Sequence, residues 1–181
     1  MPELIKIDEF TKSVIKADPS VTNEDFTRLV SSRKDIRLIR PNAFAGCNKL
    51  TNITIPEGVT SIGESAFSNC KNLANVLLPF TIKSIGPGAF TNTALSLLFI
   101  PPYIEVLSNS CLMGTHLERL DIPEGLFVRD LVDDKSIIKE YNKDTMFDAI
   151  LETTGSIKAL NDASKSMQEN LTGRKPSWGG R

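Results

Sequence analysis

The sequence predicts an α/β repeat solenoid, a right-handed stack of short coils with a helical cap before it and a helical extension after it. Two observations lead to this prediction. The leucines that open successive segments are 23, 22 and 22 residues apart: Leu50, Leu73, Leu95 and Leu117. Prolines recur at the same intervals: Pro56, Pro79, Pro101 and Pro123. Repetition at such a period is typical of coils that stack on one another.

Each part of the repeat has a physical reason. The opening pattern L-x-x-I-x-I, as in residues 50–55, shows the alternation of a short strand with one buried face. The proline that follows ends the strand because it has no N–H to donate. Later in the repeat, Ala66-Phe67 and Ala89-Phe90 put a small residue beside an aromatic one. One coil cannot bury these groups alone, whereas stacked coils form a continuous core.

The repeat resembles the BspA-like class of leucine-rich repeat, whose signature is a strand, then I-P, then V-x-x-I-G-x-x-A-F-x-x-C. The copy ITIPEGVTSIGESAFSNC (53–70) matches it nearly throughout, and the resemblance covers about residues 35–126. The third copy departs from it, with Cys111-Leu112 in place of Ala-Phe and Ser108 in place of glycine. The resemblance implies a binding or adhesion surface, and it brings no catalytic residues with it.

The chain divides into four predicted segments: an N-terminal cap (1–34), the repeats (35–126), a helical extension (127–171) and a basic tail with glycine and tryptophan (172–181). In the cap, residues 20–32 predict a helix that begins at Thr22 or Asn23, both good N-cap residues. In the extension, residues 126–142 and 143–171 are both predicted to be helical.

Composition excludes several functions. The net charge of −1 argues against a nucleic-acid partner. No segment approaches the ~20 apolar residues of a membrane span, so we expect no membrane insertion. The first twenty residues lack the apolar stretch of roughly 7–15 residues of a secretion signal. We therefore expect a protein that is made in the cytoplasm and either stays there or is incorporated into a particle such as a virion.

Catalysis, metal binding and cofactor binding are not predicted. His116 is the only histidine, and no nucleophile motif accompanies it. Cys47 and Cys70 share one repeat position, so a redox pair or a metal site is conceivable. A column of buried thiols is the preferred interpretation, because Thr93 and Thr115 continue that column. We expect Cys111 to belong to the core as well.

The outward side of the strands predicts a binding face. One outward column contains Thr54, Leu77, Phe99 and Asp121, and its neighbour contains Asn52, Asn75, Leu97 and Arg119. The central coils then expose an apolar patch with a polar rim, as protein-binding sites do. Its predicted members are Leu77, Phe80, Leu97, Phe99 and Tyr103, with Arg119 on the rim.

A second interpretation is that the chain's own C-terminal segment covers this patch. The two interpretations differ in what Phe99→Asp does. An external partner predicts lost binding with nearly unchanged thermal stability, whereas an internal cover predicts a large drop in melting temperature. A further protein contact is predicted in the tail at Arg174, Lys175 and Trp178, where positive charges surround the only tryptophan.

Together these features predict a non-catalytic protein that binds other proteins. One form of this hypothesis is a structural accessory protein of a larger assembly, such as a virion decoration or tail protein. The alternatives are an adhesin or receptor-binding module for a host surface protein or glycan, and a cytoplasmic adaptor. A fold alone does not choose between them.

Overall fold

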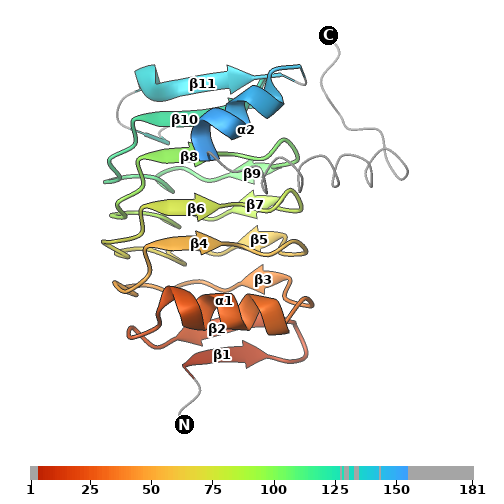
Figure 1. Ribbon diagram of the computed structural model, residues 1–181, viewed down its shortest axis with the longest axis vertical. Helices are drawn as coiled ribbons and strands as arrows, with labels where there is room; N and C mark the ends of the chain where they lie inside the picture. The colour runs from red at the N-terminus through yellow and green to blue at the C-terminus, as the bar shows by residue number, and fades with distance from the viewer. Residues whose placement is uncertain (1–3, 127, 129–130, 133–134, 143, 155–181) are drawn as a thin grey trace, which may run out of the picture.

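The computed structural model describes residues 4–126, 128, 131–132, 135–142 and 144–154. These residues form a β-solenoid of about five turns, with the coils stacked along the long axis (Figure 1). The predicted solenoid is confirmed. Within the described repeats, however, each coil consists of short strands and turns, and the two α-helices α1 and α2 lie towards the ends of the stack.

One side of the stack is a six-stranded sheet in the order β1-β2-β3-β5-β7-β9. Its strands are β1 (Ile5–Asp8), β2 (Ser13–Ala17), β3 (Leu38–Ile39), β5 (Ser61–Ile62), β7 (Ser84–Ile85) and β9 (Val106–Leu107). β1 and β2 are antiparallel, and every other neighbouring pair is parallel. Parallel pairing at the repeat spacing is what a stack of equivalent coils requires.

The other side carries the strands of the L-x-x-I-x-I pattern. These are β4 (Asn52–Thr54), β6 (Asn75–Leu77), β8 (Leu97–Phe99), β10 (Arg119–Pro123) and β11 (Ile138–Tyr141). β4 pairs with β6, and β8 pairs with β10, which pairs with β11. The two groups form separate sheets, so this side of the solenoid is divided between β6 and β8.

The core between the two sides is built as the repeat predicts. Phe44, Phe67 and Phe90 are fully buried, and their rings stack with centroids 5.0 and 5.5 Å apart and interplanar angles of 1° and 3°. The close approach of neighbouring coils explains why glycine occupies its position in the repeat. A Cβ on Gly63 or Gly86 would lie 2.6 or 2.7 Å from backbone nitrogen of the preceding coil. Only glycine lets the coils approach this closely.

The N-terminal helix α1 (Asn23–Ser32) begins as predicted. Thr22 is the N-cap, and it forms a reciprocal capping box with Asp25. Phe26 packs against Phe44 of the first coil at a centroid distance of 5.4 Å. The sheet itself ends in the β1–β2 hairpin, and α1 lies beside the first coil next to β4. The terminal layer is therefore the β1–β2 hairpin, and the predicted helix lies beside the first coil.

The helix predicted across residues 126–142 is wrong. Its described part contains a short 3-10 helix, η1 (Lys135–Ile137), and the parallel strand β11. Leu120 pairs with Ile138, an offset of 18 residues where the repeats have 22 or 23. The helix predicted at 143–171 is present as α2 (Met146–Thr154), as far as the described residues extend.

Candidate binding face

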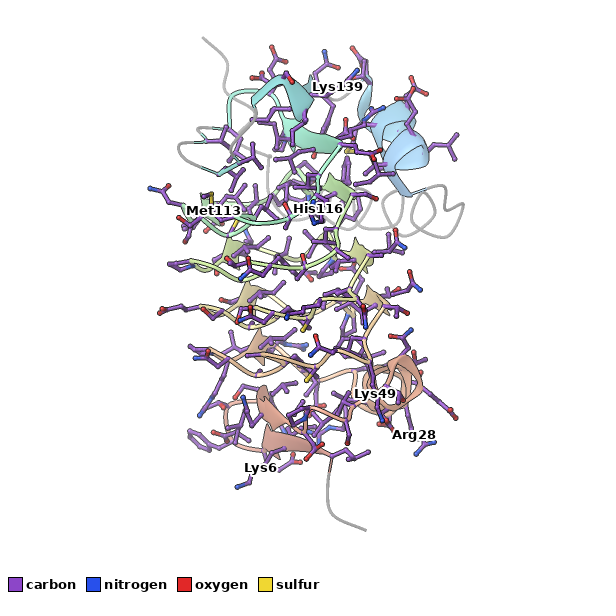
Figure 2. The ribbon with its side chains drawn as sticks, turned by 90° about the vertical axis from the view of Figure 1, so that its left-hand side faces the viewer. Lys6, Arg28, Lys49, Met113, His116 and Lys139 are labelled. Atoms are coloured by element: carbon purple, nitrogen blue, oxygen red, sulfur yellow. The ribbon has the colours of Figure 1, made fainter. Side chains whose placement is uncertain are left out.

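Both helices lie on the side of the stack that carries β4, β6 and β8. Figure 1 shows this side, and Figure 2 shows the coils edge-on, with Lys6 and Lys139 near opposite ends and both helices on one side. α1 contacts β4, whereas α2 contacts β8 and β10. The outward face of β4 and β6 lies between them. We call this face, together with Leu97 at the start of β8, the open half, and the rest of β8 with β10 the covered half.

The covered half is a second hydrophobic core. Its buried residues are Phe80, Phe99, Tyr141, Met146, Ala149 and Ile150. The Phe99 ring lies 4.8 Å from that of Tyr141 and 6.3 Å from that of Phe80. The Tyr141 hydroxyl donates a hydrogen bond of 2.6 Å to the carbonyl of Ile100, and burial raises its pKa. α2 is thus held by aromatic contacts and by a satisfied buried hydroxyl.

This packing corrects the predicted exposed patch. Phe80 and Phe99 are only 5% and 6% exposed, and Tyr103 is partly buried against the same cluster. The exposure predicted for these side chains is therefore wrong, and an internal cover, the second interpretation, describes them. The cause is the apolar side of α2, which buries itself on the aromatic side chains of the repeats.

A polar cluster fastens the C-terminal end of α2 to β10. Asp121 is 1% exposed and accepts two hydrogen bonds from the Arg119 guanidinium, Nε to Oδ2 at 2.7 Å and Nη2 to Oδ1 at 2.9 Å. The Thr153 hydroxyl also donates to Asp121, and Arg119 pairs with Glu152. These hydrogen bonds raise the pKa of Arg119. Arg119, a predicted partner contact, is thus engaged inside the molecule.

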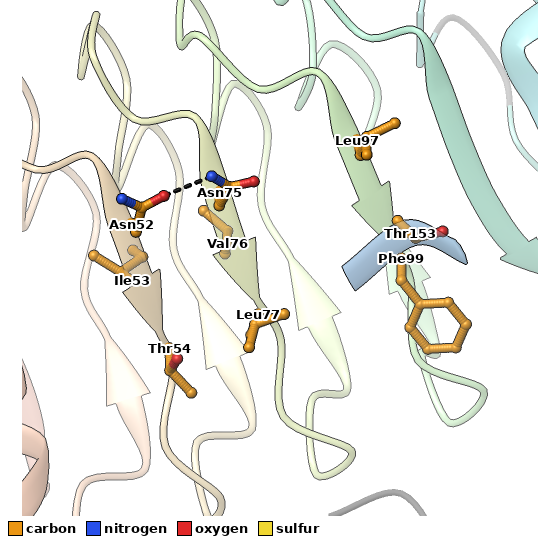
Figure 3. A pocket seen from close by; sticks show the side chains of 9 residues that line it. All are labelled: Asn52, Ile53, Thr54, Asn75, Val76, Leu77, Leu97, Phe99 and Thr153. Atoms are coloured by element: carbon orange, nitrogen blue, oxygen red, sulfur yellow. Dashed lines mark hydrogen bonds between the residues drawn. The ribbon is translucent and has the colours of Figure 1, made fainter. Parts of the chain in front are cut away.

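The open half keeps its outward side chains accessible. Asn52, Thr54 and Asn75 are exposed, and Leu77 and Leu97 are half-buried. Asn75 Nδ2 donates to Asn52 Oδ1 at 2.5 Å. A pocket of about 180 Å³ opens here beside the end of α2 (Figure 3). Its lining residues are Asn52, Ile53, Thr54, Asn75, Val76, Leu77, Leu97, Phe99 and Thr153.

The pocket lies at the division between β6 and β8, where backbone pairing is incomplete. After β4, the Ile55 N–H donates to Leu77 O at 2.9 Å, and after β8 the Ile100 N–H donates to Asp121 O at 2.8 Å. Leu78 holds the same repeat position after β6, and no such bond joins it to β8 in the described part of the chain. β6 and β8 therefore lie side by side without a continuous backbone ladder in the described part of the chain.

The start of the strands shows the same interruption. The Asn75 N–H donates to Thr51 O at 3.1 Å, and the Arg119 N–H donates to Ser96 O at 3.3 Å. Leu97 is the equivalent residue of β8, and its N–H makes no corresponding bond among the described residues. The sequence carries no evident signal for this interruption.

The thiols take the structural role preferred in the sequence analysis. Cys47, Cys70 and Cys111 are fully buried, and burial raises their pKa values to about 11, 12 and 12. Thr93 and Thr115 continue the column, and their hydroxyls donate to backbone carbonyls three residues earlier. Within the described ranges, no three His, Cys, Asp or Glu side chains could together hold a metal ion.

The predicted tail contacts Arg174, Lys175 and Trp178 lie outside the described residues. No described helix is both long and apolar enough to cross a membrane.

Comparison with known proteins identifies the repeat. The family model "BspA type leucine rich repeat region (6 copies)" matches residues 23–130, which is more than half of the chain. The chain belongs to the BspA-type leucine-rich repeat family. This family suggests protein–protein interaction or an adhesin-like surface protein, and its members are binding proteins rather than enzymes.

Solved structures of bacterial leucine-rich repeat proteins share the fold. The pneumococcal vaccine antigen PcpA is 19% identical, with a TM-score of 0.61 over 90% of this chain and 43% of that one. A leucine-rich repeat protein from Bacteroides capillosus is 25% identical, with a TM-score of 0.50 over 64% of this chain and 90% of that one.

A leucine-rich cell surface protein from Faecalibacterium prausnitzii is 36% identical, with a TM-score of 0.44 over 45% of this chain. This chain covers 22% of that protein and 43% of PcpA, so it matches only part of either. No match was found among curated proteins.

Proposed function

We propose that this chain is a protein-recognition module of an adhesin-like surface protein, and that the open half of its outward face is the binding surface. One observation carries the proposal. α2 buries the aromatic side chains of the covered half, while Leu77 on β6 and Leu97 at the start of β8 stay half-exposed beside a pocket. Membership in the BspA-type family supports a role in binding proteins.

The composition of the open half fits protein recognition. Half-buried Leu77 and Leu97 provide an apolar centre, and the exposed amides of Asn52 and Asn75 provide a polar rim. An apolar centre within a polar rim is the usual anatomy of a protein interface. Because β4 pairs with β6 and β8 pairs with β10, the strands that carry these side chains are held by backbone ladders, which lowers the entropic cost of binding.

Photo-crosslinking tests the proposal directly. A benzoylphenylalanine at position 77, in place of Leu77, is irradiated with surface protein extracts of candidate partner cells. We expect a single covalent adduct. A matched control places the crosslinker at Val106, which is 53% exposed on the opposite sheet, and we expect no adduct there. An adduct from position 106 together with none from position 77 would overturn the proposal.

The same experiment separates the other roles that the sequence leaves open. A partner from the protein's own particle would favour the accessory or virion role, and a cytoplasmic partner would favour the adaptor role. A host surface protein would favour the adhesin. Immunodetection in fractionated source cells distinguishes a surface location from the cytoplasmic or particle-borne location predicted from the sequence.

A truncated chain ending at Gly173 tests the tail, because it removes Arg174, Lys175 and Trp178. If the open half is the binding surface, the truncated chain forms the same adduct from position 77. If the adduct is lost, the tail is the attachment point and the proposal is wrong.

A further inference from the structure

We infer that the outer face of α2 is a second protein contact, and that its occupant is a basic amphipathic helix of a partner protein. The outer face consists of Phe147, Asp148 and Leu151, on the side of α2 that points away from the stack. It is separate from the open half, so the inference goes beyond the proposed function. Its support comes from the exposure of these side chains, from the way α2 is held, and from the charge around them.

Two large apolar side chains lie together on the outer face. Phe147 is 39% and Leu151 47% exposed. They are four residues apart on the helix, so they are neighbours on its surface. The other large apolar residues exposed in the described part of the chain, Phe10, Leu38 and Val106, lie on three separate segments. Single exposed apolar residues need no explanation, whereas an adjacent pair on one helix indicates a contact surface.

The opposite face of α2 is already buried. Met146, Ala149 and Ile150 pack in the covered half. Because successive helical residues are turned by roughly 100°, Phe147 and Leu151 point away from the centre of that packing. A helix that is apolar on both faces is typical of one buried between two layers. Among the described residues the stack supplies one of these layers, and a partner supplies the other.

α2 presents the outer face without rearrangement. Its C-terminal end is held to β10 by the polar cluster around Asp121. Its beginning is held by Asn142, whose Oδ1 accepts hydrogen bonds from the Asp144 N–H at 2.9 Å and the Thr145 N–H at 3.2 Å. A helix that is already fixed at both ends loses little conformational entropy when it binds.

The charge of this segment indicates the chemistry of the partner. Residues 140–152 contain four acidic residues and one basic residue. Glu152 pairs with Arg119, whereas Asp148 makes no ion pair within the described part of the chain. Asp148 is three residues from Leu151, so its carboxylate lies beside the apolar pair. An apolar pair beside a carboxylate fits a partner whose apolar side chains are flanked by lysine or arginine.

The same charge argues against other occupants. A two-fold contact between copies of the chain through this face would bring the two Asp148 side chains together, and like charges at a contact are costly. The phosphates of nucleic acid or of an anionic membrane are repelled for the same reason. A basic helix complements the charge, and the pair of side chains four residues apart forms a ridge that packs into the groove of such a helix.

The test uses the full chain labelled with nitrogen-15 and three synthetic helical peptides of about 15 residues, the length at which an isolated helix becomes stable. The first has leucines on one face and lysines on the other. The second has glutamates in place of the lysines, and the third has serines in place of the leucines. We expect the first peptide to cause saturable chemical-shift changes at the amides of Phe147, Asp148 and Leu151. The other two should bind at least roughly tenfold more weakly, because each lacks one of the two contacts.

Matched variants locate the contact. Phe147→Gln and Leu151→Gln each remove an exposed apolar side chain and keep a good helix former, so each should weaken the first peptide roughly three- to tenfold. Their melting temperatures show that the variants stay folded. Phe10→Gln makes the same change at a residue that is 95% exposed in the turn between β1 and β2, and should leave binding unchanged. Asp148→Asn should weaken binding and reduce its dependence on salt, whereas Glu64→Gln, at an exposed carboxylate of another coil, should not.

Each contrary outcome overturns the inference. Equal binding of the first two peptides, or no saturable shift in α2 up to the solubility of the first peptide, means that no basic helix binds there. Unchanged binding by both glutamine variants of α2 would place the peptide elsewhere. Shifts in α2 that depend on protein concentration alone would identify a second copy as the occupant.

The chain's own basic tail is tested separately. A chain ending at Gly173 should bind the first peptide as tightly as the full chain does, and tighter binding would identify the tail as the occupant and overturn the inference. Crosslinking from position 77 probes a different surface, so failure of the proposed function and failure of this inference are distinguishable.

Discussion

The open and covered halves of the outward face occupy the same repeat positions, but their side chains differ in exposure to solvent. In one outward column, Thr54 is exposed and Leu77 half-buried, whereas Phe99 and Asp121 are buried. Ladder pairing aligns Thr54 with Leu77 and Phe99 with Asp121, so local structure does not explain the difference. It comes from α2, which lies on β8 and β10. A repeat thus fixes which side chains point outward, while elements beyond the repeat decide which are exposed.

The largest expected contrast is in stability. Phe99→Ala removes a ring packed between Phe80 and Tyr141, so it should lower the free energy of unfolding by about 3–5 kcal/mol. Leu77→Ala, in the same column of the open half, should cost about 1 kcal/mol because Leu77 is only half-buried. Urea unfolding measures both. Equal losses would contradict the division into two halves.

A smaller contrast is expected for the polar cluster. Asp121→Ala leaves the Thr153 hydroxyl without its acceptor and the Arg119 guanidinium with Glu152 alone, so it should cost roughly 1–3 kcal/mol. Thr54→Ala, the outward position of β4, should change the free energy of unfolding by about 0.5 kcal/mol or less. Chemical denaturation of each variant provides the comparison. If Asp121→Ala left the free energy of unfolding unchanged, the cluster would not hold α2 against β10.

The two halves should not differ in the reactivity of the thiols that lie in the core behind them. Cys70 lies behind the open half and Cys111 behind the covered half, and both thiols are fully buried with pKa values raised to about 12. Both should therefore resist pulsed alkylation by iodoacetamide at about pH 8, at which buried neutral thiols are poor nucleophiles. Mass spectrometry measures labelling, with the urea-unfolded chain as control. Rapid labelling of one thiol alone would show that the halves differ in the core too.

The same thiols fix the sign of a pH effect. Their pKa is about 9.0 when unfolded and about 12 when folded for Cys70 and Cys111. Above about pH 9 the unfolded chain loses these protons first, so the free energy of unfolding should fall as the pH rises towards 12. Replacing Cys70 with Ala should reduce this dependence. Stability that rises over this range would contradict the burial of the thiols.

Periodicity predicted the parts of the fold that repeat. The Ala-Phe pairs, the thiol column and the Thr22 cap were all evident from spacing and local chemistry, because each depends on neighbours in sequence or on the repeat offset. β11 was missed for two reasons. It follows β10 at an offset of 18 residues, which differs from the repeat spacing of 22 or 23, and its two central residues, Lys139 and Glu140, are exposed.

The site was predictable only in part. The outward columns follow from strand alternation, and the apolar stripe of α2 was visible in the sequence. Which coils that stripe covers depends on nonlocal contacts such as Phe99 with Tyr141 and Thr153 with Asp121. The division between β6 and β8 depends on how closely two backbones approach, and β8 and β10 pair at the same 22-residue spacing that separates β6 from β8. Spacing alone therefore could not reveal it.

Amide hydrogen exchange of the unmodified protein tests most directly the claim that the outward face is divided at β6 and β8. Asn75, Leu97 and Arg119 hold equivalent positions, and among the described residues Leu97 is the one of the three whose N–H makes no such bond to the preceding coil. Asn75 is exposed, whereas Leu97 and Arg119 are half-buried. We predict that the Leu97 N–H exchanges fastest of the three, although its residue is not the most exposed. Equal or greater protection of Leu97 would mean that the strands are paired there and that the outward face is not divided.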